Sequence, residues 1–132
     1  WKEYWQFDLH NPVDSSNPLG LAKLRNQAFS TSGSELQHFE HNGKTYGHIL
    51  DPRTGWPVEP MQTICVFAPT AAEAEVLSTS FYVMGVEKTL KYCDNYKNIG
   101  VLILSLPDSS GKHEIVTANL NEDIVEVMKE SC

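Results

Sequence analysis

The sequence predicts an α+β fold in which a mainly antiparallel sheet carries helices packed on one face. Three observations lead to this class. Strand-like segments fill the first half of the chain, two helical segments follow one another after residue 69, and further strand-like segments come later. This order differs from the alternation of strands and helices that is typical of parallel α/β sheets. With a length of 132 residues, we expect residues 1–132 to form one domain.

The first half of the chain contains several strand signals. Residues 3–10 form an aromatic-rich, alternating run that predicts a strand. Asn and Pro residues over 11–20 predict a loop, and residues 21–29 are expected to form the second strand. Asn42-Gly43 predicts a two-residue hairpin turn, because both central residues of such a turn adopt positive φ. Residues 36–46 are therefore expected to fold into two short antiparallel strands.

The second half begins with a rigid loop and a capped helix. Residues 51–57 hold two prolines and a glycine, and the β-branched run 62–68 predicts a strand. Thr70 favours a helix start, because its hydroxyl can cap the helix and Glu73 completes a capping box. Gly85 favours the end of that helix. The elements expected after it are a helix over 86–94, a strand over 99–106, a strand near 114–117 and a short helix over 122–129.

Composition excludes some functions. Ten Lys and Arg residues against seventeen Asp and Glu residues give a net charge of −7, which disfavours a nucleic-acid partner or an anionic membrane surface. No apolar run approaches the roughly 18–20 residues of a membrane span, so we expect none. Cys65, Cys93 and Cys132 are widely separated, which argues against a zinc site or a redox dithiol. At most one disulfide is possible, and we expect buried or free thiols.

The predicted helix after residue 69 carries a candidate cation site. Ser78 and Thr79 follow Glu75 by three and four residues, so the three side chains should share one helix face. One carboxylate and two hydroxyls offer only oxygen ligands, which suits a hard cation such as Mg²⁺. The alternative is that these side chains form an ordinary solvated face.

The rigid loop and its neighbours offer further candidates. His48 precedes the loop and is suited to accept a proton near neutral pH, or it is a half-buried strand residue bonded to backbone. Arg53 is suited to pair with a phosphate, whereas Asp51 either takes part in the site or shapes the loop through an Asx turn. Small hydroxyl residues over 30–34 surround Gly33 and would let a phosphate or a backbone approach closely, unless they form only a strand-end turn.

Taken together, these segments resemble the C-terminal portion of the ApbE family, the FAD:protein FMN transferases. The resemblance covers essentially the whole chain and implies the ApbE type of fold, related to T-fold repeats. At two positions where the family usually or often has Asp, this chain has Glu75 and Ser34. The matching motifs are Thr31-Ser32-Gly33, Phe39-Glu40, Asn42-Gly43-Lys44, Tyr46, His48-Ile49-Leu50-Asp51-Pro52-Arg53-Thr54-Gly55-Trp56-Pro57-Val58, Phe67-Ala68-Pro69 and the helical run from Ala74 to Lys88.

The resemblance implies an Mg²⁺-dependent transfer of FMN from FAD onto a Thr hydroxyl of a target flavoprotein, with release of AMP. It implies His48 as the base for the incoming Thr, and a bacterial cell-envelope or periplasmic location, with the cytoplasm as the alternative. A flavin- or nucleotide-binding module without catalysis, or a plain interaction domain, are the other interpretations. The implied metal ligands are Glu75, Ser78 and Thr79, and the implied FAD contacts are Ile49, Asp51, Arg53, Thr54 and Gly55.

Overall fold

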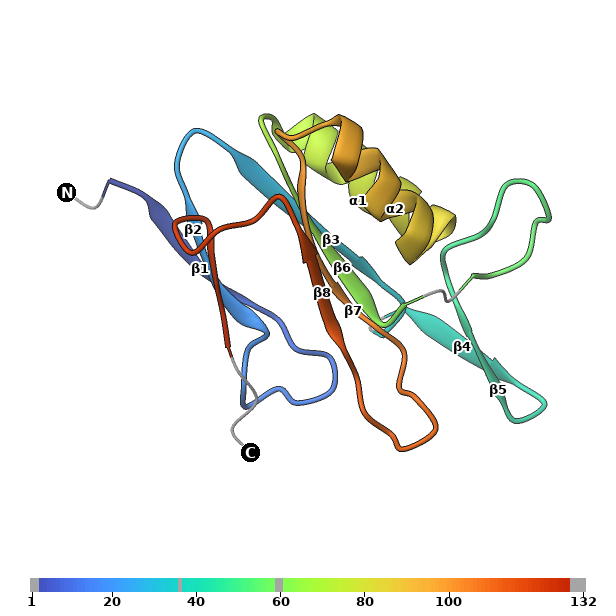
Figure 1. Cartoon of the computed structure of the whole chain (residues 1–132). Coiled ribbons are helices and arrows are strands. Elements are labelled where there is room, and N and C mark those ends of the chain that lie inside the picture. The colour runs from blue at the N-terminus through green and yellow to red at the C-terminus, as the bar shows by residue number, and fades with distance from the viewer. Residues whose placement is uncertain (1–2, 36, 59–60, 129–132) are drawn as a thin grey trace.

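The computed structural model describes residues 3–35, 37–58 and 61–128 (Figure 1). Its strands, in chain order, are β1 (Trp5–Leu9), β2 (Gly20–Leu24), β3 (Ala28–Gly33), β4 (His38–His41), β5 (Lys44–Gly47), β6 (Thr63–Ala68), β7 (Gly100–Leu104), β8 (Ile115–Ala118) and β9 (Val125–Val127). Two helices, α1 (Ala71–Met84) and α2 (Val86–Asn95), lie between β6 and β7.

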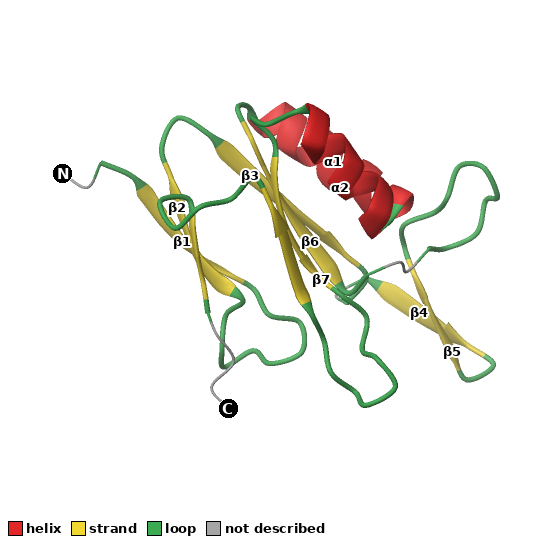
Figure 2. Cartoon of the chain, in the orientation of Figure 1, coloured by secondary structure: helices red, strands yellow, loops and turns green. Residues whose placement is uncertain are grey.

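The architecture is layered around a four-stranded antiparallel sheet with the strand order β3-β6-β7-β8. Both helices lie together on one face of this sheet, and the β4-β5 hairpin projects away from it (Figure 2). A second sheet, with the order β1-β2-β9, packs on the opposite face. The predicted α+β class with helices on one face is therefore confirmed, and the second sheet adds a layer.

The sequence of β6 explains why both faces of the central sheet are covered. All six of its residues are buried. Ile64 and Val66 belong to the core beneath the helices, whereas Cys65 and Phe67 belong to the core beneath the second sheet. Because successive side chains of a strand point to opposite faces, a strand that is buried throughout and apolar from its second residue onward needs cover on both sides.

Several local predictions are confirmed. Asn42 and Gly43 have φ values of 51° and 74°, and the strands on either side of this turn pair as expected. The Thr70 hydroxyl accepts a hydrogen bond from the backbone N–H of Glu73 at 3.2 Å and caps α1. Gly85 ends α1 with a φ of 84°, in the region that favours glycine.

Two predicted elements are wrong. Residues 21–29 do not form one strand, because a turn with Asn26 at a φ of 53° separates β2 from β3, and the chain passes there from one sheet to the other. The helix predicted over 122–129 is a turn followed by β9, whereas residue 129 lies outside the described residues. Asn121 Oδ1 accepts hydrogen bonds from the backbone of this turn, and Val125 is buried against the second core.

The predicted free thiols are confirmed for the two cysteines within the described residues. Cys65 and Cys93 are both buried and unpaired with another cysteine. Burial raises the pKa of the Cys65 thiol to about 11 and also raises the pKa of Cys93. Cys132 lies outside the described residues.

The raised pKa of Cys65 predicts slow alkylation of the folded chain. A shift from 9.0 to about 11 reduces the reactive thiolate about 100-fold, and burial also hinders access of the reagent. We expect iodoacetamide to modify Cys65 at least about 100-fold more slowly in the native chain than in urea. Peptide mapping by mass spectrometry over a time course measures both rates, and equal rates would contradict the prediction.

Candidate functional site

A hollow of about 450 Å³ lies where β3, α1 and the segment after β5 meet. It joins three features that are separated along the sequence, namely the hydroxyl-rich run, the His48 segment and the polar face of the helix. Its lining residues are Thr31, Ser32, Gly33, His48, Ile49, Leu50, Glu75 and Thr79.

The predicted trio on α1 divides between the hollow and the helix–sheet contact. Glu75 and Thr79 line the hollow and are exposed. Ser78 is completely buried, and its hydroxyl lies 3.2 Å from Ser30 Oγ and 2.9 Å from Ser32 Oγ. The apolar side of the helix packs into the core as predicted, with Phe81, Leu77 and Met84 in or against the first cluster.

Two serines of β3 belong to the hydroxyl-rich run over 30–34 that was a candidate in the sequence, but their contacts with α1 were not predicted. Ser30 Oγ donates a hydrogen bond to Glu75 Oε2 at 2.5 Å, and Ser32 Oγ lies 3.3 Å from Thr79 Oγ1. Thr31, between them, instead donates to Cys65 Sγ at 3.3 Å. The signal that identifies the two serines is the alternation of a strand, which places residues 30 and 32 on the same face.

His48 follows β5 directly, is exposed and is one of the residues that line the hollow. Its Nδ1 lies 3.0 Å from the Gln37 carbonyl oxygen, and its backbone N–H donates to the same oxygen at 3.2 Å. Because a carbonyl oxygen only accepts, Nδ1 carries a proton in this contact, and the neutral ring then has its lone pair on Nε2. The backbone bond expected in the alternative interpretation is present, but it leaves Nε2 able to accept a proton.

Asp51 and Arg53 hold the rigid loop in shape. The buried Asp51 carboxylate accepts hydrogen bonds from Arg53 Nε at 2.8 Å and Arg53 Nη2 at 2.6 Å, and from the Arg53 backbone N–H at 2.9 Å. These bonds lower the pKa of Asp51 to about 2. The Asp51 carbonyl also accepts from the backbone N–H groups of Thr54 and Gly55, and Gly55 has a φ of 72°.

Of the five residues predicted to contact FAD, the structure places one in the hollow. Ile49 lines it, whereas Asp51, Arg53, Thr54 and Gly55 form the loop that follows. The backbone N–H of Val58 donates to the Ile49 carbonyl at 3.0 Å, so the base of this loop is closed beside the hollow. The Asx turn considered for Asp51 is confirmed by the hydrogen bond from the Arg53 backbone N–H to Asp51 Oδ1.

The low pKa of Asp51 predicts how stability depends on pH. Because the folded pKa lies below the ordinary 3.8, ionised Asp51 stabilises the fold above that pH, and this contribution is lost as pH falls toward 2. We expect the free energy of unfolding, measured by urea titration, to fall as the pH is lowered from about 4 to 2. This fall should be less steep in the Asp51→Asn variant than in the unmodified chain. Asp14 and Asp108 also have lowered pKa values and contribute equally in both proteins. Equal slopes would contradict the prediction.

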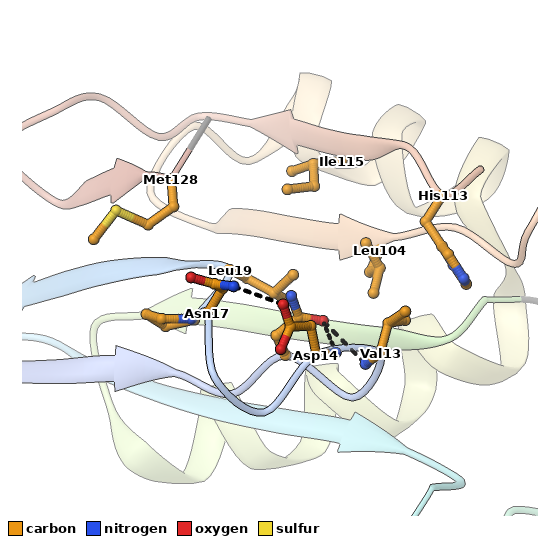
Figure 3. A pocket seen from close by; sticks show the side chains of 10 residues that line it. Val13, Asp14, Asn17, Leu19, Leu104, His113, Ile115 and Met128 are labelled. Carbon is orange, nitrogen blue, oxygen red and sulfur yellow. Dashed lines mark hydrogen bonds between the residues drawn. The ribbon is translucent and has the colours of Figure 1, made fainter. Parts of the chain in front are cut away.

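A larger hollow, of about 520 Å³, lies toward the second sheet (Figure 3). Its polar side chains are already engaged, since Asn17 Nδ2 donates to Asp14 Oδ2 at 2.6 Å and His113 Nδ1 donates to the Ser105 carbonyl at 2.8 Å. No part of the predicted site lines it. The lining residues are Asn11, Val13, Asp14, Asn17, Pro18, Leu19, Leu104, His113, Ile115 and Met128.

Two negative findings apply to the part of the chain that the structure describes. No three His, Cys, Asp or Glu side chains gather there as a possible metal-binding group. Among the described lining residues of the first hollow, the side-chain oxygens are the Glu75 carboxylate and the hydroxyls of Thr31, Ser32 and Thr79. Neither α1 nor α2 has the length and apolar character required to cross a membrane.

Comparison with known proteins assigns the chain to a family. The sequence profile of the ApbE family matches residues 2–103, and the chain belongs to this family. The FAD:protein FMN transferase of Haemophilus influenzae is 32% identical over 108 residues, covering 80% of this chain and 31% of that protein. The enzyme of the same name from Escherichia coli K12 is 36% identical over 86 residues, covering 64% of this chain and 24% of that protein.

Solved structures agree with this assignment. The ApbE protein of Thermotoga maritima superposes with a TM-score of 0.71 at 28% identity, over 86% of this chain and 36% of that one. The flavin transferase ApbE of Vibrio cholerae gives a TM-score of 0.69 at 25% identity, over 86% of this chain and 35% of that one. The expected family and fold type are confirmed. The chain spans between about a quarter and a third of the length of the sequence relatives.

Proposed function

We propose that this chain contributes the His48 segment and the α1 face to an FAD:protein FMN transferase, which moves FMN from FAD onto a Thr hydroxyl of a target flavoprotein and releases AMP. The observation that carries the proposal is that Glu75, Thr79 and His48 line one hollow. The names of the relatives support the same reaction, since two of them are FAD:protein FMN transferases.

The donor set of the hollow fits Mg²⁺. Glu75 supplies one carboxylate and Thr79 one hydroxyl, and Mg²⁺ in phosphate-handling sites is commonly bound through one or two carboxylates, with water and substrate phosphate completing its shell. Ser78 is buried between α1 and β3, so it would act on such a site only through its hydrogen bonds to Ser30 and Ser32. When bound, the cation would neutralise charge on the pyrophosphate of FAD and make the attacked phosphorus more electrophilic.

His48 is proposed to move the proton of the reaction. As the acceptor Thr oxygen forms its bond to the phosphorus of the FMN portion, the bond from that phosphorus to the bridging oxygen breaks. The electron pair leaves with AMP. The Thr proton passes to His48 Nε2, whose lone pair is available because Nδ1 donates to the Gln37 carbonyl.

The loop after His48 is proposed to lie along FAD. Ile49 lines the hollow with its backbone fixed by Val58, while the Asp51–Arg53 pair keeps Thr54 and Gly55 in a defined turn. A rigid backbone at this place positions the phosphorus for attack without an ordering cost during each turnover.

The proposal is tested with the full native protein, FAD, Mg²⁺ and a peptide or protein that carries an acceptor Thr. We expect AMP release to match the amount of flavin attached to Thr, measured by chromatography and mass spectrometry on the same sample. Flavin that copurifies with the protein, without AMP release or covalent attachment, would favour a binding module without catalysis. Neither flavin binding nor transfer would contradict both interpretations.

A further inference from the structure

The two side chains that α1 presents to the hollow are joined by a continuous set of hydroxyl groups. Ser30 Oγ lies 2.5 Å from Glu75 Oε2 and 3.2 Å from Ser78 Oγ. Ser32 Oγ lies 2.9 Å from Ser78 Oγ and 3.3 Å from Thr79 Oγ1. Both serines come from β3, so the strand and the helix share one network along their contact.

The direction of each hydrogen bond follows from counting protons, because a hydroxyl has one proton and a carboxylate has none. Ser30 therefore donates a hydrogen bond to the Glu75 carboxylate. Ser32 donates its one hydrogen bond to Ser78 Oγ. In the remaining contact of Ser32, the Thr79 hydroxyl must therefore be the donor. The Ser78 proton has two acceptors, the Glu75 carbonyl at 3.0 Å and Ser30 Oγ at 3.2 Å.

The protons of this network thus all point from Thr79 toward Glu75. As a result, the Thr79 hydroxyl donates its hydrogen bond to Ser32 Oγ, and the lone pairs of its oxygen remain available to the hollow that Thr79 lines. Glu75 Oε2 is held by Ser30, and among the described residues no Lys, Arg or His pairs with this carboxylate. Both groups face the hollow as electron-pair donors.

We propose that Ser30 and Ser32 are positioning residues for the cation site. Ser30 orients the Glu75 carboxylate by donating a hydrogen bond to it, and Ser32 orients the Thr79 hydroxyl by accepting its hydrogen bond. This inference rests on the Mg²⁺ site of the proposed function and adds the residues that orient it. A hydroxyl binds a cation through a lone pair, so its proton needs another acceptor. Mg²⁺ tolerates little deviation from octahedral geometry, and outer-shell partners of metal ligands usually matter nearly as much as the ligands.

The experiment measures cation binding by the chain itself, with Mn²⁺ as a paramagnetic probe. In the ¹⁵N-labelled chain, we expect Mn²⁺ to broaden the amide signals of Gly33 and Thr79 selectively, and Mg²⁺ to reverse the effect. Ser30→Ala and Ser32→Ala should each raise the Mn²⁺ dissociation constant by about 10- to 100-fold. Ser30→Thr, which keeps a hydroxyl, should restore the affinity.

Ser80→Ala is the matched control, because Ser80 is on the same helix and its hydroxyl donates only within the helix, to the Val76 carbonyl at 2.7 Å. Its affinity should equal that of the unmodified chain. Thermal unfolding identifies any variant that fails to fold, and the Ser30→Ala and Ser30→Thr pair decides the matter if Ser32→Ala does not fold.

Unchanged Mn²⁺ affinity in Ser30→Ala would overturn the inference, and so would an unmodified chain that shows no selective broadening at this hollow. Failure of the proposed function has a different signature, since it is a lack of FMN transfer by the full native protein. A protein without transfer whose Mn²⁺ affinity still depends on Ser30 would keep the positioning role and reject the reaction.

Discussion

His48→Ala in the full native protein should lower the rate of FMN transfer by about 10²- to 10⁴-fold while leaving the affinity for FAD nearly unchanged. In the proposed reaction, the acceptor Thr hydroxyl has a very high pKa and must lose its proton as it attacks phosphorus. The imidazole offers Nε2 for that proton, with its orientation fixed by the Gln37 carbonyl. The measurement combines single-turnover flavin attachment with an FAD titration on the same preparation.

His38→Ala is the matched control for this substitution. His38 is also exposed and its Nδ1 also lies close to a carbonyl oxygen, that of Glu35 at 2.8 Å, but it does not line the hollow. A purely structural role of His48 would lower the melting temperature and leave the activity of each folded molecule near normal. Normal turnover in well-folded His48→Ala would reject the catalytic role.

The features that the sequence predicted correctly depend on local interactions. The Asn42-Gly43 turn and the cap formed by Thr70 each involve residues no more than three positions apart, and the structure contains both. The helix predicted over 122–129 failed for the opposite reason. Its residues contain a strand that pairs with β2, about a hundred positions earlier, and that pairing overrides a helical pattern.

The candidate site was predictable in its residue types but not in its full geometry. Relative to Glu75, an ideal helix places Ser78 about 60° to one side and Thr79 about 40° to the other. The sequence alone does not say which side meets the sheet. In the structure Ser78 is the one that turns inward, where it meets Ser30 and Ser32.

The tautomer of His48 could not be predicted from the sequence either. It depends on a contact with the carbonyl of Gln37, eleven positions earlier, and only the folding of the β4-β5 hairpin brings the two residues together. The same hairpin returns the chain to the body of the fold beside α1, so that His48 lines the same hollow as Glu75. Local turn chemistry thus predicts the hairpin, while the consequence for the site appears only in three dimensions.

Glu75→Gln should make FMN transfer far more dependent on the concentration of Mg²⁺. The substitution keeps the length of the side chain and an acceptor for the Ser30 hydroxyl, but it removes the negative charge that Glu75 offers to a cation in the hollow. We expect the Mg²⁺ concentration for half-maximal activity to rise by about 10- to 100-fold, with much of the lost rate recovered at high Mg²⁺.

Two comparisons separate this outcome from a general effect of charge or stability. Glu122→Gln removes the same charge from an exposed turn outside the hollow, and its Mg²⁺ dependence should match that of the unmodified protein. His48→Ala should lose activity without recovery at high Mg²⁺, because the missing group accepts a proton and does not bind the cation. If Glu75→Gln shows the same Mg²⁺ dependence as Glu122→Gln, the carboxylate is not a cation ligand, and the position of Glu75 in the hollow requires another explanation.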